Sequence, residues 1–424
     1  MIAVKLDLPE TAIPIYKHAL NLVGQLANTQ IDFSQEAQIT IGVEGQGRSI
    51  EISSAWLEQL TQKDFNHEKV LRDSPVIALQ TGEPDYLSSA VYLMNYLQEY
   101  AAEEDDLGRF PFGASLQKRF GVADSNLVHD YFQQVTRQLG ISEILSKPSR
   151  LFVSHDNDSL YGSFTKDGFY ALKNGRLDWL FRIVWSEIMQ NPRWMNMGQM
   201  MDINDEYDLK STFFWIANNR PTKVGNRMLN NGDYQISNSK TQAIIDKISE
   251  RGFHQGLHKS VNDQSFSEEL EMLPYSAKSN RNHYLKLNIP HHFSQLDKSD
   301  VEIDFSLGFA EEFGLRNNYA LPVRPFDVSR DKQCKALYVP LMVMDTTNWS
   351  YRKQDLKGLK SNLLDLMEKH KEDAIISVLW HNKYFTDMKF SGYLEVYRAM
   401  LDFCRNSGIR PITQEEILRE YSAS

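Results

Sequence analysis

The sequence predicts an α/β protein whose C-terminal two-thirds is built on a mainly parallel sheet. Apolar runs lie at 151–153, 212–216 and 374–379, and helical patterns lie at about 176–190, 238–250, 354–370 and 391–406. Strands that alternate with helices are typical of parallel sheets. Each apolar run leads into His, Asp or Asn residues. We expect these polar side chains at the carboxyl ends of strands, where functional groups of such folds collect.

The first 145 residues predict a smaller α/β unit, so that the chain is expected to form two domains, 1–145 and 146–424. A length of 424 residues suits two domains better than one. Apolar and polar residues alternate in 39–43 and 50–52, and Gly45-Gln46-Gly47 between them predicts a β-hairpin. A helix is expected over 85–102. The acidic run 103–106 then ends it and is expected to be solvated rather than metal-binding.

Composition excludes several classes of protein. A formal net charge of −10 argues against nucleic acid as the main partner, because phosphate binding needs clustered Lys and Arg. Cys334 and Cys404 lie in different predicted elements, which predicts two reduced thiols in a cytoplasmic protein rather than a zinc cluster or a disulfide framework. No apolar run reaches 18 residues and no secretory pattern is visible, so no membrane span is expected. Nothing in the sequence indicates the oligomeric state.

The first candidate site is the cluster at 155–158, directly after an apolar run. Asp156 and Asp158 are two residues apart, so in an extended chain they point the same way. Two neighbouring carboxylates repel each other unless a cation or a proton lies between them. One of them can hold a metal while the other takes a proton from water. The alternative is an Asx-rich turn that only caps the next element.

A second candidate is the histidine pair His254 and His258. The i, i+4 spacing would suit two ligands on one helix face, but Gly252 and Gly256 argue for a strand end. In that case only one histidine points into the site, and a lone histidine is commonly structural.

Two further candidates follow later in the chain. Arg281, His283 and Leu285 are expected on one face of a strand, and His381 follows the apolar run 374–379. No single segment is specific, but their joint occurrence at strand ends makes an active site plausible.

Read together, these segments resemble the polysaccharide-deacetylase (NodB-homology) superfamily, and most closely a bacterial branch with an added N-terminal domain. The matching segments are 106–111, 152–158, 211–214, 252–260, 281–284, 301–309 with 314–317, and 379–382. The resemblance implies a distorted (β/α) barrel. It also implies a divalent metal, usually zinc, that activates water for attack on an acetyl carbonyl.

The resemblance also implies roles for individual residues. Asp156 would be the catalytic base, oriented by Arg281. Asp158 and His258 would bind the metal. His381 would be the general acid that protonates the leaving group, a task for which histidine is suited.

Two positions depart from the family pattern. The usual second metal histidine, four residues after the first, is Asn262 in this chain. We therefore expect His283 as the third ligand, with the Asn262 oxygen as the alternative, although an amide oxygen binds zinc weakly. The closing motif ends in Asn382 rather than Asp, which leaves His381 without a neighbouring carboxylate in the sequence.

The function implied is that of a hydrolase removing an acetyl group from an N- or O-acetylated sugar of a surface glycan or its precursor. The expected partner is therefore a carbohydrate. The alternative is a non-catalytic protein on the same fold that binds glycans or assists polysaccharide assembly. Trp349, Tyr351 and Trp380 are candidates for stacking on sugar rings, and core packing is the alternative role for each.

Overall fold

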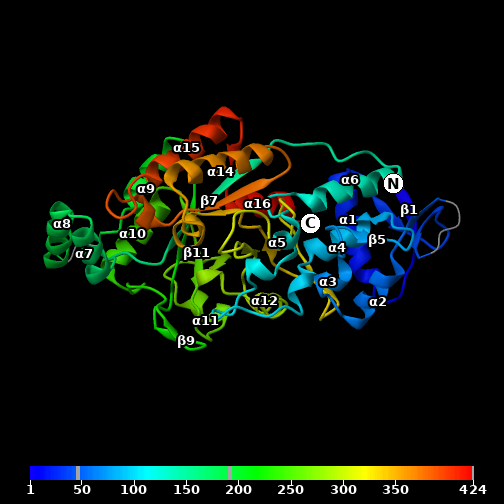
Figure 1. Ribbon diagram of the computed structural model, residues 1–424, viewed down its shortest axis with the longest axis horizontal. Coiled ribbons are helices and arrows are strands. Elements are labelled where there is room, and N and C mark those ends of the chain that lie inside the picture. The colour runs from blue at the N-terminus through cyan, green and yellow to red at the C-terminus, as the bar shows by residue number, and fades with distance from the viewer. Residues whose placement is uncertain (44–47, 190–192, 423–424) are drawn as a thin grey trace.

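The computed structural model describes residues 1–43, 48–189 and 193–422, and it contains two separate parallel sheets (Figure 1). The larger sheet is a curled half-barrel, compatible with the distorted (β/α) barrel predicted for the C-terminal part. Its strands in spatial order are β16 (Leu337–Tyr338), β13 (Ile303–Asp304), β12 (Ser279–Asn282), β11 (His254–Lys259), β8 (Thr212–Trp215), β7 (Arg150–Asn157), β18 (Ile375–Leu379) and β17 (Val343–Met344), and β19 (Arg410–Pro411) pairs with β7.

Helices connect the strands of this sheet, and every pairing within it is parallel, as predicted. The helices are α7 (Phe164–Lys173), α8 (Leu177–Ile188), α9 (Met197–Asp205), α10 (Ser239–Glu250), α11 (Phe266–Glu271), α12 (His291–Leu296), α13 (Asp345–Thr347), α14 (Leu356–Lys369), α15 (Tyr393–Asn406) and α16 (Gln414–Tyr421). The helices expected at 176–190, 238–250, 354–370 and 391–406 are confirmed as α8, α10, α14 and α15. Polar caps define two starts: Asn238 accepts a hydrogen bond from Lys240 N–H, and Asp355 accepts one from Gly358 N–H.

The strands around β7 are buried on both faces, as expected for the centre of a parallel sheet. One face packs on the helices. On the other, an aromatic cluster fills the inside of the curl, where Phe152 stacks on Phe305 with ring centroids 4.2 Å apart. Gly256 of β11 makes room for this cluster, because a Cβ there would lie 2.5 Å from the Phe214 ring. The strand order and this packing direct the polar residues at the strand ends toward one edge.

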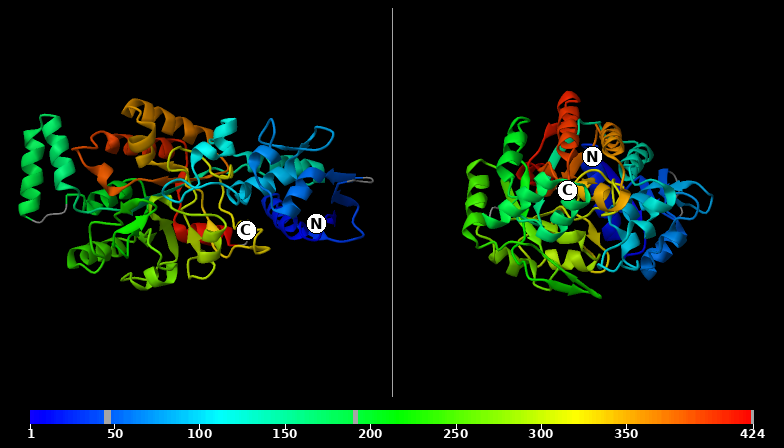
Figure 2. Two further views of the ribbon diagram at one scale, coloured as in Figure 1. Left: turned by 60° about the horizontal axis from the view of Figure 1, so that its bottom comes forward. Right: turned by 60° about the vertical axis from the view of Figure 1, so that its left-hand side comes forward.

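The first part of the chain forms the smaller sheet and helices that cover it (Figures 1 and 2). Its strands in order are β2 (Ile31–Phe33), β1 (Ile2–Asp7), β3 (Ile39–Gly42) and β4 (Arg48–Glu51), and its helices are α1 (Ile13–Leu26), α2 (Ser54–Gln62), α3 (His67–Val70), α4 (Tyr86–Met94), α5 (Leu116–Phe120) and α6 (Leu127–Leu139).

Three small antiparallel pairs lie outside the two parallel sheets. They are β5 (Ile77–Ala78) with β6 (Pro84–Asp85), β9 (Thr222–Val224) with β10 (Arg227–Leu229), and β14 (Phe326–Asp327) with β15 (Lys332–Gln333).

Two predictions for this part are wrong. The strands at 39–42 and 48–51 pair in parallel, with Ile41 opposite Ile50, so they do not form a hairpin. Alternation fixes which face of a strand is buried but not its direction, and the expected turn Gly45-Gln46-Gly47 lies outside the described residues. The helix expected over 85–102 ends at Met94, because Tyr96 adopts a left-handed φ of 57°. A short helical turn, η1 (Leu97–Glu99), follows it.

The two parts meet along a buried seam. Tyr319, Val323 and Phe326 belong to the hydrophobic core of the first part although they follow β13 in the chain. At the same seam Arg316 donates to both oxygens of Glu99, over 2.8 and 2.6 Å, and both side chains are 1% exposed. The domain boundary expected near residue 145 stays a prediction.

Two expected features can be compared directly with the structure. In the described residues, no helix is both long and apolar enough to cross a membrane. Cys334 and Cys404 are both buried and unpaired, as expected for free thiols.

We predict that Glu99→Ala lowers the free energy of unfolding by about 3–5 kcal/mol, because it leaves the Arg316 guanidinium buried without its carboxylate. Urea unfolding followed by tryptophan fluorescence measures this change. Glu302→Ala is the matched control, since it removes a carboxylate from an exposed pair with Lys278 and should change the unfolding midpoint little. Equal effects of the two substitutions would contradict a special role for the seam.

Candidate active site

The centre of the site is the end of β7. Alternate residues of this strand share one face: Phe152 in the aromatic cluster, then Ser154, then Asp156 near the carboxyl end. The Asp156 side chain is 3% exposed, and Asp158, just beyond the strand, is 22% exposed. Both carboxylates approach the same histidine nitrogen: Oδ2 of Asp156 lies 3.6 Å from His258 Nε2, and Oδ1 of Asp158 lies 3.2 Å from the same atom.

Two histidines from neighbouring strands converge on Asp158. His258 lies on β11, and His283 lies in the short turn η3 (His283–Leu285) that follows β12. His283 Nε2 is 3.6 Å from Asp158 Oδ1. One possible ligand atom from each of Asp158, His258 and His283 lies within 4.8 Å of the other two. This trio is a candidate metal site.

The donor set fits a divalent metal. His258 Nδ1 lies 2.8 Å from the carbonyl oxygen of Arg281 and donates to it, and Nε2 on the other side of the ring lies 3.2 Å from Asp158 Oδ1. A ligating histidine is commonly fixed in this way by a backbone carbonyl behind it. Two imidazoles and one carboxylate are a familiar set for zinc in catalytic sites, where one coordination position stays open.

The charges in the trio are already arranged for a cation. Burial alone would raise the pKa of Asp158, but the nearby His381 and the hydrogen bond to His258 hold it well below its ordinary value. Burial lowers the pKa of His283 to about 3, which keeps its imidazole neutral. An ionised carboxylate and a neutral imidazole are the forms that bind metals.

Behind the trio, Arg281 approaches Asp156. Arg281 Nη1 lies 3.9 Å from Asp156 Oδ2, and Nη2 donates to Ser154 Oγ over 3.0 Å. Arg281 is fully buried above the ring of Phe214. Asp156 Oδ1 has no hydrogen-bond partner among the described residues. The guanidinium thus lies beside one oxygen of Asp156 and leaves the other unengaged.

On the other side of Asp158 stands His381, which follows β18. Its Nε2 lies 3.4 Å from Asp158 Oδ2. Its Nδ1 lies 2.7 Å from Asp345 Oδ1, and its backbone N–H donates to Asp345 Oδ2 over 2.5 Å. Asn382 leaves His381 without a neighbouring carboxylate in the sequence, but the structure supplies one from a distant segment: Asp345, directly after β17. The signal was present in the sequence as an apolar run, 341–344, that ends in Asp.

Several candidates take other roles. His254, at the opposite end of β11, pairs with Glu415 over 2.8 Å, so only His258 of that pair enters the site. The Asn262 oxygen accepts a hydrogen bond from Gln264 N–H. His155 is fully buried on the helix-facing side of β7, where its ring contacts the Trp380 carbonyl and Asn204, and it is structural.

The prediction of one strand that carries Arg281, His283 and Leu285 on the same face is wrong, because β12 ends at Asn282. Tyr284 and Leu285 adopt left-handed φ values of 59° and 52°, which ends β12 and turns His283 toward Asp158. The turn also places the half-exposed Tyr284 ring against His283, with centroids 4.0 Å apart. Tyr284 and Lys383, whose Nζ lies 3.7 Å from Asp158 Oδ2, are site residues that the sequence analysis missed.

The three aromatic candidates for sugar stacking separate into two groups. Trp380 is fully buried against Tyr393 and Tyr397, so it belongs to the core. Trp349 and Tyr351 are partly exposed on the turn η4 (Asn348–Arg352). The Tyr351 hydroxyl lies 3.4 Å from Arg109, in the loop that precedes α5.

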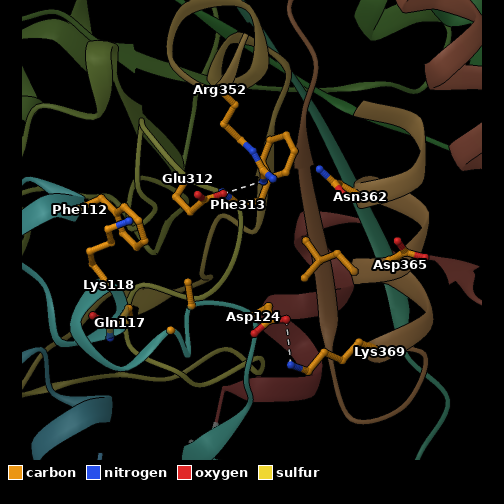
Figure 3. Close-up of a pocket in the computed structure, with 13 residues that line it drawn as sticks. Phe112, Gln117, Lys118, Asp124, Glu312, Phe313, Arg352, Asn362, Asp365 and Lys369 are labelled. Carbon is orange, nitrogen blue, oxygen red and sulfur yellow. Dashed lines mark hydrogen bonds and ion pairs between the residues drawn. The ribbon is translucent and has the colours of Figure 1, made fainter. Parts of the chain in front are cut away.

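A separate cavity of about 540 Å³ lies at the seam between the two parts of the chain, between residues 112–124 and α14 (Figure 3). Its lining carries three cations and three anions. Arg352 pairs with Glu312 over 2.6 Å, and Lys369 pairs with Asp124 over 2.9 Å. None of the site residues described above lines it. Its charges are largely neutralised within the lining, so it offers no chemistry comparable with that around Asp158.

Comparison with known proteins adds one distant likeness. No protein-family model matches the sequence, and no curated protein matches it either. Among solved structures, the chain is similar to the chitin deacetylase from the fungal pathogen Colletotrichum lindemuthianum, with 12% sequence identity and a TM-score of 0.33 over 64% of this chain and 88% of that chain. At this distance the function has to be argued from the site itself.

We predict that the wild-type protein binds zinc and that Asp158→Ala, His258→Ala and His283→Ala each lose most of it, because each removes one of three candidate ligands. Elemental analysis of purified protein and zinc titration calorimetry measure the loss. Asn262→Ala is the control and should bind zinc as the wild type does. Loss of zinc in Asn262→Ala but not in His283→Ala would make Asn262 the third ligand.

Proposed function

We propose that the protein is a metal-dependent deacetylase that acts on an N- or O-acetylated sugar of a surface glycan or its precursor. The proposal rests on how five side chains are arranged. The trio Asp158, His258 and His283 lies between a buried carboxylate, Asp156, and His381, whose ring contacts a carboxylate of its own. A candidate base and a candidate acid therefore stand on either side of a candidate metal site, as hydrolysis of an amide or ester requires.

The metal would be held by Asp158, His258 and His283. When bound, a divalent ion such as zinc makes water more acidic and polarises an acyl carbonyl. The chain's own contribution is to orient these three ligands, and to favour the ionised form of Asp158 and the neutral form of His283. His258 is fixed through its Nδ1 hydrogen bond to Arg281, and His283 is fixed by the turn that ends β12.

Asp156 is proposed as the general base. Its free Oδ1 accepts a proton from water as the water oxygen bonds to the acyl carbon. Arg281, whose Nη1 lies 3.9 Å from Oδ2, holds Asp156 in place and is a positioning residue.

His381 is proposed as the general acid. The Nδ1 contact with Asp345 holds the ring so that Nε2 faces Asp158 and the site. Nε2 gives its proton to the departing nitrogen or oxygen of the sugar as the bond from that atom to the acyl carbon breaks. The products are acetate and a sugar with a free amine or hydroxyl group.

The open side of the site suits a carbohydrate. Asp158 is its most exposed carboxylate, and the half-exposed Tyr284 ring lies beside it over His283. A sugar ring has apolar C–H faces that pack on such a ring. We place the substrate on this side, and we regard residues 1–145 as an accessory domain.

We predict that Asp156→Asn keeps bound zinc but lowers turnover by about 10²–10⁴-fold, because the base is lost while the ligands remain. Acetate release from acetylated amino-sugar oligomers and from nucleotide-activated acetylated sugars measures turnover. His254→Ala, on the same strand as His258 but outside the site, is the control and should retain full activity. If Asp156→Asn is fully active, Asp156 is not the base.

We also predict that His381→Ala lowers turnover by about 10²–10⁴-fold and removes the alkaline limb of the pH–rate profile, where the acid would lose its proton. Asp345→Asn should have a smaller effect in the same direction, because it disturbs the orientation of His381 without removing it. Wild-type protein that is loaded with zinc yet inactive on the whole panel of acetylated sugars would favour the alternative, a glycan-binding or polysaccharide-assembly protein.

A further inference from the structure

Helices α7 and α8 form a hairpin that stands out from the half-barrel. Figures 1 and 2 show it projecting at the end of the molecule opposite β1 and α1. The hairpin is inserted in the connection between β7 and β8, and α7 begins at Phe164, six residues after Asp158. It is therefore linked directly to the candidate active site.

The inner side of the hairpin is well packed. Ile183 and Ala171 are buried, Tyr170 stacks on Trp179 with centroids 6.2 Å apart, and Lys389 lies over the Tyr170 ring. The buried pair Asp167–Arg193 fastens the base of the hairpin. The hairpin is thus held to the body through one side, and its other side is free.

That other side is apolar to an unusual degree for a protein surface. Six large apolar side chains are 56–70% exposed: Phe169 and Leu172 on α7, and Leu177, Phe181, Trp185 and Ile188 on α8. On α8 they recur at intervals of three and four residues, which gives one continuous stripe. A contiguous exposed apolar surface marks a site of interaction with another protein or with a membrane.

The charges of the hairpin distinguish between these partners. Each of its acidic residues pairs with an arginine: Asp167 and Glu187 with Arg193, and Asp178 with Arg176. Lys166, Lys173 and Arg182 are exposed and form no ion pair within the described residues. The uncompensated charge of the hairpin is therefore entirely positive, in a chain whose formal net charge is −10.

The free cations lie beside the apolar stripe. Lys166 and Lys173 are three residues before and four residues after Phe169, so they flank it on the same side of α7. Arg182 directly follows Phe181 in the middle of α8. Apolar and aromatic side chains flanked by Lys and Arg are typical of helices that lie in the interface of an anionic bilayer.

We propose that the α7–α8 hairpin docks the protein on an anionic membrane surface. The helices have ten and twelve residues, too short to span a bilayer, so they lie in the headgroup region with the apolar stripe inserted. Lys166, Lys173 and Arg182 meet the anionic headgroups. A second copy of the chain fits less well, because a twofold axis through the middle of α8 would bring Arg182 next to its own copy.

Sedimentation of the full-length protein with lipid vesicles tests the proposal. The anionic vesicles contain phosphatidylcholine with about 30% phosphatidylglycerol and should bind the protein. Vesicles of phosphatidylcholine alone should bind it much less. The triple variant Phe169→Ser, Phe181→Ser, Trp185→Ser should lose at least about tenfold in partitioning. The triple variant Lys166→Gln, Lys173→Gln, Arg182→Gln should lose about a hundredfold on the anionic vesicles, and raised salt should act in the same direction.

Matched controls separate the hairpin from general surface effects. Leu145→Ser removes an apolar side chain that is 78% exposed elsewhere, and Lys298→Gln, Lys357→Gln, Lys360→Gln removes three exposed cations outside the hairpin. Both controls should bind vesicles as the wild type does. Absence of binding to the anionic vesicles overturns the proposal. A second result also overturns it: light scattering shows a wild-type dimer, the triple serine variant is a monomer, and neither protein binds vesicles. The stripe then pairs with a second copy of the chain. Urea unfolding followed by tryptophan fluorescence checks that each variant is folded.

Discussion

The parallel pairing of β7 with β8 and β18 is the constraint on which the candidate site depends. Asn157, the last residue of β7, lies opposite Trp215, the last residue of β8, and β18 ends at Leu379 opposite Ser154, so the carboxyl ends of all three strands lie at the same side of the sheet. That edge receives Asp156 and Asp158 from one strand and His381 from another more than 200 residues later. A shift of β7 by one residue would turn both carboxylates to the helix-facing side, where His155 now lies.

Side chains on the inside of the curled sheet are apolar at the start of the strands and charged at their carboxyl ends. The apolar layer supports the buried charged residues above it. Phe152, Phe214 and Phe305 fill the lower part of the curl, and Arg281 lies on the Phe214 ring. A buried guanidinium is costly without a carboxylate, and Asp156 is the acid that faces it. The aromatic layer excludes water from below, so the interactions among Asp156, Arg281 and His258 act in a medium of low polarity. Packing and electrostatics are therefore coupled at the site.

Much of this arrangement follows from the sequence, because strand ends and helix periods are local signals. The apolar runs before Asp156 and His381 and the periodic helices at 238–250 and 391–406 correspond to elements of the structure. What could not be predicted depends on contacts between distant segments. The carboxylate behind His381 is Asp345 rather than a sequence neighbour, and β3 and β4 run parallel although their alternation is equally compatible with a hairpin. The left-handed turn at Tyr284 has no Gly or Asn to mark it.

The connection between β7 and β8 combines two kinds of surface with opposite requirements. At its start, Asp158 is held by charges and hydrogen bonds to residues of other strands, so its position is determined by the sheet. Farther along, the stripe around Phe181 contributes little to the core, because its side chains already contact solvent. The helical period alone predicts α8 but cannot show whether its apolar side is covered, and only the placement of the hairpin outside the half-barrel shows that it is not. Since the stripe stabilises no part of the sheet, its residues are free to serve an external surface without altering the geometry at Asp158.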